Sequence, residues 1–224
     1  MSPLKRLIYS TIGGKTLVGL TGLALSLFVL THMAGNMLIF VGPEAYNKYG
    51  HALTSNPLIY VAEAGLVAVF LIHVVKAAFL TKKNWSARSQ KYAVSASGDK
   101  ATSQIQKTLW AQGLVILVFV VLHLLTFKYG NYYEVTYGDE SIRDLFRLIV
   151  EIFNQPIYVI GYSIALIILG LHLSHGVSSA FQTLGLNHPK YTPLIKSFSL
   201  FYAVVVAAGF LSQPIYVYFF HKGA

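Results

Sequence analysis

The sequence predicts an all-α integral membrane protein, a bundle of five transmembrane helices with a short amphipathic helix on the outer side. The 224-residue chain is 55% hydrophobic and 11% charged, and its mean hydropathy is +0.58. That composition is too apolar for a soluble domain of this size. Five apolar runs reach the roughly 20 residues that a helix needs to cross the hydrocarbon core of a bilayer. We therefore expect one transmembrane domain over residues 1–224.

The five predicted membrane helices lie near residues 16–41, 57–80, 105–128, 156–183 and 193–219. Pro57, Pro156 and Pro193 stand near the starts of the second, fourth and fifth runs. A proline is tolerated there because the N–H groups of a first helical turn have no partner within the helix. The first run lacks a clear small-residue cleavage site, so we expect it to stay in the protein as a membrane anchor.

The distribution of Lys and Arg predicts the orientation of the chain. Basic residues gather before the first run, in the connection at 81–104 and around residue 190, which all lie on one side if the chain crosses five times. The connection at 129–155 is comparatively acidic. Since positive loops stay in the cytoplasm, we expect a cytoplasmic N-terminus and an outer C-terminus. Basic loops on one side of the membrane thus account for the net charge of +9, so the charge does not indicate nucleic acid as a partner.

Two of the connections carry further information. Residues 139–153 read DESIRDLFRLIVEIF, with apolar residues at helical spacing, which predicts the short amphipathic helix on the outer surface. Residues 84–104 are polar and rich in Ser, Ala and Lys. This second stretch is either a solvated loop or a docking surface for a cytoplasmic partner.

Histidines lie deep inside four of the five runs: His32, His73, His123, and the pair His172 and His175. An imidazole in hydrocarbon has lost its water and must find a partner, so each is a candidate functional residue. Four helices that offer imidazoles to a bundle interior indicate metal or haem ligation. The chain has no cysteine, which excludes covalently attached haem, iron–sulfur clusters and disulfides from it.

The depths of these histidines predict two levels of ligation. Counted from the cytoplasmic ends of their runs, His32 lies roughly 24 Å deep and His123 roughly 28 Å deep. His73 lies roughly 13 Å deep, against roughly 18 Å for His172 and roughly 13 Å for His175. The two levels differ by on the order of 10 Å, so two stacked haems would fit.

The fourth run leaves two ligand candidates open. Depth alone slightly favours His175 as the partner of His73. Gly176, one helical turn after His172, favours His172 because a small residue gives a flat porphyrin room to lie against the helix. Gly35 on the first run has the same potential role, and either glycine can instead be a helix-packing contact.

The segments around the histidines are LTHMAGNM at His32, FLIHVVKAAF at His73, VVLHLLTF at His123 and HLSHGVSSAF at His172. In their order and depth they resemble the five-helix, dihaem cytochrome b membrane subunit of succinate:quinone oxidoreductases, the succinate dehydrogenases and fumarate reductases. The resemblance runs from the first to the fifth predicted helix, so it covers nearly the whole chain.

The resemblance implies an assignment of the ligands. His32 and His123 would hold the outer haem b, and His73 and His172 the inner haem b. The choice of His172 follows the family pattern, in which three residues separate the fourth-helix histidine from a glycine. His175 is an extra residue that would contact the inner haem or replace His172 as its ligand.

The resemblance also implies partners and a location. A flavoprotein with covalently bound FAD and an iron–sulfur protein would rest on the cytoplasmic face of the cell's inner (cytoplasmic) membrane, and the dicarboxylate active site would lie on a partner subunit. This chain would pass electrons to or from a membrane quinone, with menaquinone expected, in the respiratory chain and the tricarboxylic acid cycle. The direction of flux and the oligomeric state of the complex stay open.

Two charged residues within the second run are further candidates. Glu63, about ten residues before His73 and toward the outer haem, is either the group that transfers protons at the quinone site or an interfacial carboxylate. Lys76, three residues after His73, is either a contact of an inner-haem propionate or a side chain that extends to the membrane interface.

Two alternative functions stay open. The chain could be the cytochrome b subunit of another respiratory complex, a hydrogenase or formate dehydrogenase, although basic cytoplasmic loops count against partners on the outer side. It could also be a proton transporter that is lined by histidines and contains no haem.

Overall fold

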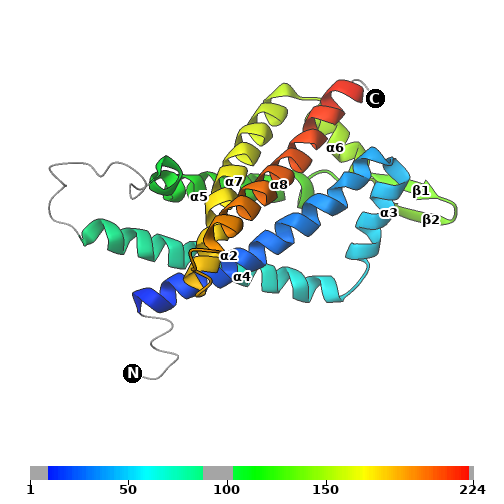
Figure 1. Cartoon of the computed structure of the whole chain (residues 1–224). Helices are drawn as coiled ribbons and strands as arrows, with labels where there is room; N and C mark the ends of the chain where they lie inside the picture. The colour runs from blue at the N-terminus through cyan, green and yellow to red at the C-terminus, as the bar shows by residue number, and fades with distance from the viewer. Residues whose placement is uncertain (1–9, 88–102, 222–224) are drawn as a thin grey trace. The chain divides into compact units, whose positions relative to one another are not determined.

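The computed structural model of the chain describes residues 10–87 and 103–221. Most of these residues are helical, and a single short hairpin of two strands accompanies the helices in this part of the chain (Figure 1). The elements in order are α2 (Thr11–Asn36), η1 (Met37–Phe40), α3 (Pro43–Thr54), α4 (Leu58–Ser86), α5 (Gln104–His123), η2 (Leu124–Lys128), β1 (Glu134–Tyr137), β2 (Glu140–Arg143), α6 (Leu145–Phe153), α7 (Pro156–Thr183) and α8 (Thr192–Phe220).

The prediction of an all-α protein with five membrane spans is confirmed. Five helical segments are long and apolar enough to cross a bilayer: Thr11–Phe40, Leu58–Ser86, Gln104–Lys128, Pro156–Thr183 and Thr192–Phe220. The first helix begins at residue 11 rather than 16, because the side chain of Ser10 accepts a hydrogen bond of 3.0 Å from the N–H of Gly13 and caps it. Apolar patterning marks only the embedded part of a helix and therefore misses such polar ends.

The orientation of the chain in the membrane stays a prediction. Many of the basic residues on which it rests lie at 1–9 and 88–102, outside the described residues. The suggested docking surface at 84–104 falls largely within the same stretch, so it also stays untested.

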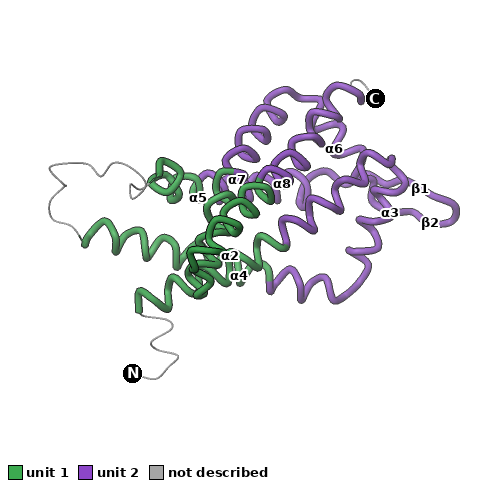
Figure 2. The backbone as a smooth tube through the Cα atoms, in the orientation of Figure 1, with its two compact units in different colours: residues 1–27, 66–114, 171–203 green, residues 28–65, 115–170, 204–224 purple. Residues whose placement is uncertain are grey.

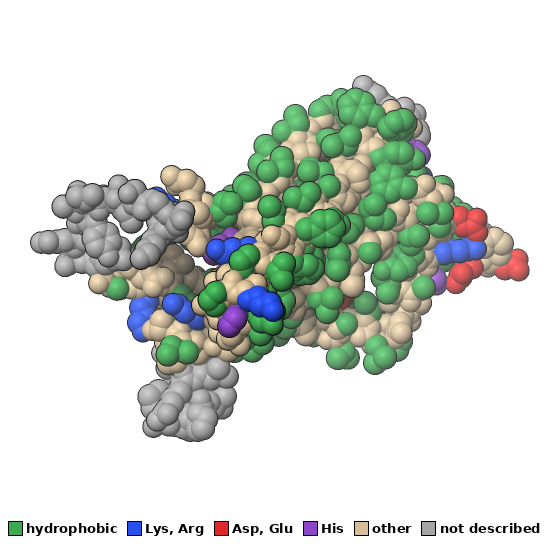
Figure 3. All heavy atoms as spheres, viewed as in Figure 1, with side chains coloured by type: hydrophobic (Ala, Val, Ile, Leu, Met, Phe, Trp, Pro, Cys, Tyr) green, Lys and Arg blue, Asp and Glu red, His purple; other side chains and the backbone are tan. Residues whose placement is uncertain are grey.

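Apolar side chains are spread over the face of the molecule that Figure 3 shows, and the long helices expose many large apolar residues. Val61 and Ile157 are each 71% exposed, and Phe219 is 69% exposed. Soluble proteins do not expose apolar surface on this scale, because each such side chain would be hydrated at a cost in free energy. Lipid tails remove that cost, so the chain is a multi-pass membrane protein.

The chain divides into two compact units (Figure 2). Unit 1 consists of residues 1–27, 66–114 and 171–203, and unit 2 of residues 28–65, 115–170 and 204–224. The five long helices α2, α4, α5, α7 and α8 each contribute one segment to each unit. Each unit is therefore a set of five helical segments, and unit 2 also holds α3, the hairpin and α6.

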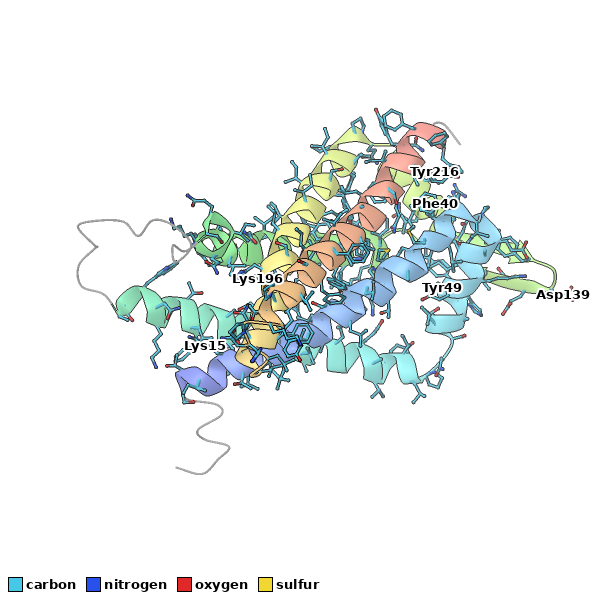
Figure 4. The ribbon with its side chains drawn as sticks, in the orientation of Figure 1. Lys15, Phe40, Tyr49, Asp139, Lys196 and Tyr216 are labelled. Carbon is cyan, nitrogen blue, oxygen red and sulfur yellow. The ribbon has the colours of Figure 1, made fainter. Side chains whose placement is uncertain are left out.

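The core of unit 2 is apolar and aromatic. Its buried residues are Ile39, Tyr46, Phe146, Ile149, Val150, Phe153, Tyr162, Leu166 and Val217. In the same unit, the end of the first span packs against α8. The ring centroids of Phe40 and Tyr216 lie 4.7 Å apart there (Figure 4). This core draws on α3, α6, α7 and α8, so it fixes the non-membrane elements against the helices.

The prediction of a helix over residues 139–153 is wrong at its N-terminal end. Residues 140–143 form β2, which pairs antiparallel with β1 so that Glu134 faces Arg143. Gly138 makes the turn with a φ of 64°, a value that favours glycine, and Asp139 lies at the tip (Figure 4). The helix starts only at Leu145, because Asp144 caps it by accepting a hydrogen bond of 3.0 Å from the N–H of Arg147.

Helix α6 is the short amphipathic helix that the sequence predicts. Its apolar face packs into the core of unit 2, and Phe146, Leu148, Ile149, Val150 and Phe153 are all buried. An amphipathic pattern shows that a helix has one apolar face, but it does not show whether lipid or protein covers that face. In this chain protein covers it.

Helix α3 between the first two spans was not predicted, because its sequence PEAYNKYGHALT has no apolar stripe of membrane length. It is attached to the start of α6 by Asn47, which is fully buried. The Asn47 amide donates to Asp144 Oδ1 over 2.9 Å and to the Tyr137 hydroxyl over 3.2 Å. Its carbonyl oxygen accepts from the Phe146 N–H over 2.9 Å. One side chain thus joins α3, the hairpin and α6.

We expect Asn47→Ala to lower the free energy of unfolding by about 1–3 kcal/mol, because it leaves buried polar groups without partners. Thermal unfolding of the detergent-solubilised protein measures the effect. Lys48→Ala is the matched control, since Lys48 lies next in the sequence and its ion pair with Glu44 is exposed. An Asn47→Ala variant as stable as Lys48→Ala would contradict the proposed attachment.

Candidate functional site

Two of the predicted histidines meet inside unit 2. His32 extends from α2 and His123 from the end of α5, with ring centroids 5.9 Å apart and ring planes at 86°. Both rings are partly buried. Aromatic rings surround them at centroid distances between 5.3 and 5.9 Å: Phe28 and Phe210 lie against His32, and Phe119 and Phe127 lie against His123.

The second pair meets inside unit 1. His73 extends from α4 and His172 from α7, with ring centroids 6.5 Å apart and ring planes at 74°. A Cβ built at Gly22 of α2 would lie 3.2 Å from His73 Cε1, which is a tight contact. The missing side chain at Gly22 therefore gives the imidazole room to lie close to the backbone of α2.

The separation within each pair fits two axial ligands of one iron. A metal–imidazole bond is about 2 Å long and each bonding nitrogen lies roughly 1 Å from its ring centre, so two axial imidazoles have centroids about 6 Å apart. The observed 5.9 and 6.5 Å lie on either side of this value. The described residues contain no cluster of three or more His, Cys, Asp or Glu side chains that could hold a metal ion by themselves.

The second ring nitrogens differ in their surroundings. His73 Nδ1 lies 3.1 Å from the hydroxyl of Thr21, and His123 Nδ1 lies 3.3 Å from the hydroxyl of Tyr162. His172 Nδ1 is buried without a hydrogen-bond partner among the described residues. A metal-bound imidazole usually donates its other N–H to an oxygen, which fixes the ring and its tautomer. Each pair thus contains one ring with such an oxygen beside it.

His32 is linked instead to the α3 helix through an amide. Tyr46 donates from its hydroxyl to Asn36 Oδ1 over 2.6 Å, and Asn36 Nδ2 donates to the His32 carbonyl over 2.8 Å. Burial raises the pKa of the Tyr46 phenol above its ordinary value, so the hydroxyl keeps its proton and remains a donor. This chain of contacts ties the helix that carries His32 to α3.

Of the two candidates on the fourth span, His172 is the one whose ring lies beside His73. His175 is half-buried, and its ring makes no contact with the His73 ring among the described residues. Ligation by His172 stays a prediction, as does the role of His175 as a contact of the cofactor or as the alternative ligand.

The two glycines that were expected to make room for a porphyrin, Gly35 and Gly176, have different surroundings. A Cβ on Gly35 would lie 2.5 Å from the Tyr49 hydroxyl, so Gly35 is a packing contact between α2 and α3. A Cβ on Gly176 would meet nothing within 4 Å. Open space beside the helix that carries His172 is what a flat ligand would need.

The charged candidates have different surroundings. Glu63 of α4 forms an ion pair with Lys128 of η2 in unit 2, and both side chains are 39% exposed. The Glu63 carboxylate is therefore partly accessible to solvent and is also paired with an ammonium group. Lys76 lies half-buried on α4, one helical turn after His73.

Arg143 was not singled out from the sequence. Its Nη2 donates to the carbonyl of Phe127 over 3.0 Å and to that of Asn131 over 3.2 Å. Phe127 lies in η2, a π-helical turn that follows His123 directly, and Asn131 lies three residues beyond the end of that turn. Gly130 is required beside them, because a Cβ there would lie 1.9 Å from the Thr126 carbonyl oxygen. Arg143 therefore fixes the chain just beyond a candidate ligand.

No family model, curated protein or solved structure matches this chain.

On the prediction that His172 holds one of two haems, we expect Gly176→Leu to leave the fold intact and to remove about half of the haem, because a leucine would enter the space beside His172. Pyridine haemochrome absorbance per protein measures haem content. Gly65→Leu is the control, since a Cβ there also meets nothing within 4 Å and Gly65 is exposed on α4. Full haem content in Gly176→Leu would show that no porphyrin occupies this space.

Proposed function

We propose that this chain is the dihaem cytochrome b membrane-anchor subunit of a succinate:quinone oxidoreductase, that is, a succinate dehydrogenase or fumarate reductase. It would pass electrons between an iron–sulfur subunit and a membrane quinone. The observation that supports this most is the meeting of four intramembrane imidazoles in two pairs, with centroids 5.9 and 6.5 Å apart. Each pair joins two different spans, α2 with α5 and α4 with α7.

The proposed ligands follow the observed pairs. His32 and His123 would hold the outer haem b, and His73 and His172 the inner haem b. When bound, each haem supplies an iron that accepts and releases one electron. The four phenylalanines around the outer pair would keep water away from that site.

Other residues would serve the same centres. His175 would contact the inner haem or take the place of His172, and Lys76 would meet a propionate, since an ammonium pairs readily with a carboxylate in an apolar setting. Gly176 would leave the porphyrin room on α7.

Glu63 and Lys128 would handle protons at the quinone site. A quinone takes up protons as it is reduced and gives them up as it is oxidised, so its site needs groups that exchange protons with water. The Glu63 carboxylate and the Lys128 ammonium contact each other and are both partly accessible. Lys128 follows His123 by five residues on the same span, which would place the pair near the outer haem. We expect menaquinone as the quinone.

The partner subunits would carry the remaining chemistry. The chain has no cysteine, so the iron–sulfur clusters must be held elsewhere, by an iron–sulfur subunit on the cytoplasmic face. A flavoprotein subunit with FAD would hold the dicarboxylate active site. The complex would lie in the cytoplasmic membrane of the cell.

Reduced-minus-oxidised absorbance spectra of the purified membrane complex test the proposal. We expect the bands of low-spin haem b with two haems per chain, together with a copurifying flavoprotein. A colourless, iron-free protein from cells grown with ample haem would refute the proposal and favour a proton transporter. Copurification with a hydrogenase or formate dehydrogenase would favour the other alternative.

Single substitutions of the histidines assign the ligands. We expect His32→Ala and His123→Ala to remove one haem, and His73→Ala and His172→Ala to remove the other, because each iron loses an axial nitrogen. His175→Ala should retain both haems. Loss of a haem in His175→Ala but not in His172→Ala would reverse the fourth assignment.

We expect Glu63→Gln to lower quinone-linked turnover by about 10-fold to 100-fold, since it removes a proton acceptor while keeping the shape of the side chain. The electron transfer from succinate to a soluble acceptor should be unchanged, because that reaction does not use the quinone site. Glu44→Gln is the control, as it alters an exposed ion pair with Lys48 on α3. Intact quinone-linked turnover in Glu63→Gln would remove this role.

A further inference from the structure

Thr21 of α2 contacts two backbone carbonyls of its own helix and one imidazole of α4. Its side chain is buried, with 9% of its surface exposed. The hydroxyl donates to the carbonyl oxygens of Leu17 over 2.6 Å and of Val18 over 3.3 Å, and its oxygen lies 3.1 Å from Nδ1 of His73. All four residues belong to unit 1.

The contacts of the Thr21 hydroxyl favour one tautomer of His73. A hydroxyl has one hydrogen, and a carbonyl oxygen can only accept, so the short contact to Leu17 takes that hydrogen. The Thr21 oxygen then faces His73 with a lone pair. A lone pair can be satisfied at 3.1 Å only by an N–H, so Nδ1 of His73 carries the proton. In a neutral imidazole the other nitrogen, Nε2, is then unprotonated.

We propose that Thr21 is a positioning residue that fixes His73 as the Nδ1–H tautomer and thereby presents Nε2 as the ligand nitrogen of the inner centre. The assignment of a centre to His73 rests on the proposed function, whereas the tautomer rests on the contacts among Thr21, the carbonyls of Leu17 and Val18, and His73. A metal requires the lone pair of a deprotonated nitrogen, so a ring held as the Nε2–H tautomer would have to exchange its proton before it could bind.

Gly22, the next residue, adds a steric restraint. A Cβ there would lie 3.2 Å from His73 Cε1 and 3.6 Å from Nδ1. The imidazole thus lies against the backbone of α2 at Gly22 and is hydrogen-bonded at Thr21. Two adjacent residues fix both the position of the ring and the position of its proton.

The partner imidazole lacks this support. His172 Nδ1 is buried without a hydrogen-bond partner among the described residues. An oxygen that accepts from the N–H of a ligating imidazole makes the ring a stronger electron donor to the metal. His73 is therefore the stronger donor of the pair, and the oxidised form of an iron held between them would depend on Thr21 for part of its stability.

Thr21→Val tests the proposal, because valine keeps the shape of threonine but replaces the hydroxyl with a methyl group. We expect the midpoint potential of the inner haem to rise and its retention in dilute detergent to fall by about 10-fold or more, the usual effect of removing such a partner. The outer haem should be unchanged, since neither contact involves unit 2. Thr21→Ser restores the hydroxyl and should restore both properties.

Thr16→Val is the matched control. Thr16 lies on the same helix and its hydroxyl donates to the Ile12 carbonyl over 3.1 Å, but it contacts no histidine ring among the described residues. Equal shifts in Thr16→Val and Thr21→Val would overturn the proposal, as would an inner haem that is unaffected by Thr21→Val.

Nitrogen NMR of ¹⁵N-histidine-labelled protein without haem separates this inference from the proposed function. We expect the His73 signals of the unsubstituted protein to show a protonated Nδ1, and those of Thr21→Val to show a mixture of tautomers. A protonated Nε2 in the unsubstituted protein would overturn the inference even if haem is bound. A protein that never binds haem but shows protonated Nδ1 would refute the function and leave the Thr21–His73 contact established.

Discussion

Imidazoles at membrane depth are the constraint on which the rest of the structure depends. Lipid offers an imidazole no hydrogen bond, so each ring must be satisfied by another part of the protein or by a ligand. The rings of His32 and His123 meet from different spans, as do those of His73 and His172. One ring of each pair also lies beside a hydroxyl, that of Tyr162 or of Thr21. Around them the chain places oxygens, glycines and aromatic rings, each of which makes sense as support for a ring that has lost its water.

The helices and the two levels of histidines could be predicted because both depend on distance along one helix. Depth did not identify His172 as the partner of His73, because it slightly favoured His175. Hydropathy marks each span locally, and the rise per residue gives each histidine a depth without knowledge of its neighbours. Helix α3 and the hairpin could not be found in this way. Their stability depends on long-range contacts such as the bonds of Asn47 to Asp144 and Phe146, which no local pattern reports.

The residues that contact the histidine rings could not be predicted either, because their contacts also depend on long-range packing. Thr21 and Tyr162 are ordinary polar residues of their helices, and only the packing of a second helix brings a histidine nitrogen within 3.1 or 3.3 Å of them. Gly35 and Gly176 look equivalent in the sequence, since each follows a histidine closely. The structure distinguishes them because a tyrosine from α3 fills the space beside one and not the other.

The π-helical turn η2 after His123 also affects what the chain can tolerate. The N–H of Tyr129 bonds the carbonyl of Leu124 over 3.0 Å, a step of five residues where an α-helix has four. Such a turn accommodates one extra residue and shifts the residues after it around the helix axis. Because η2 and residues 129–133 separate His123 from the hairpin, a change in the length of the hairpin need not rotate that imidazole.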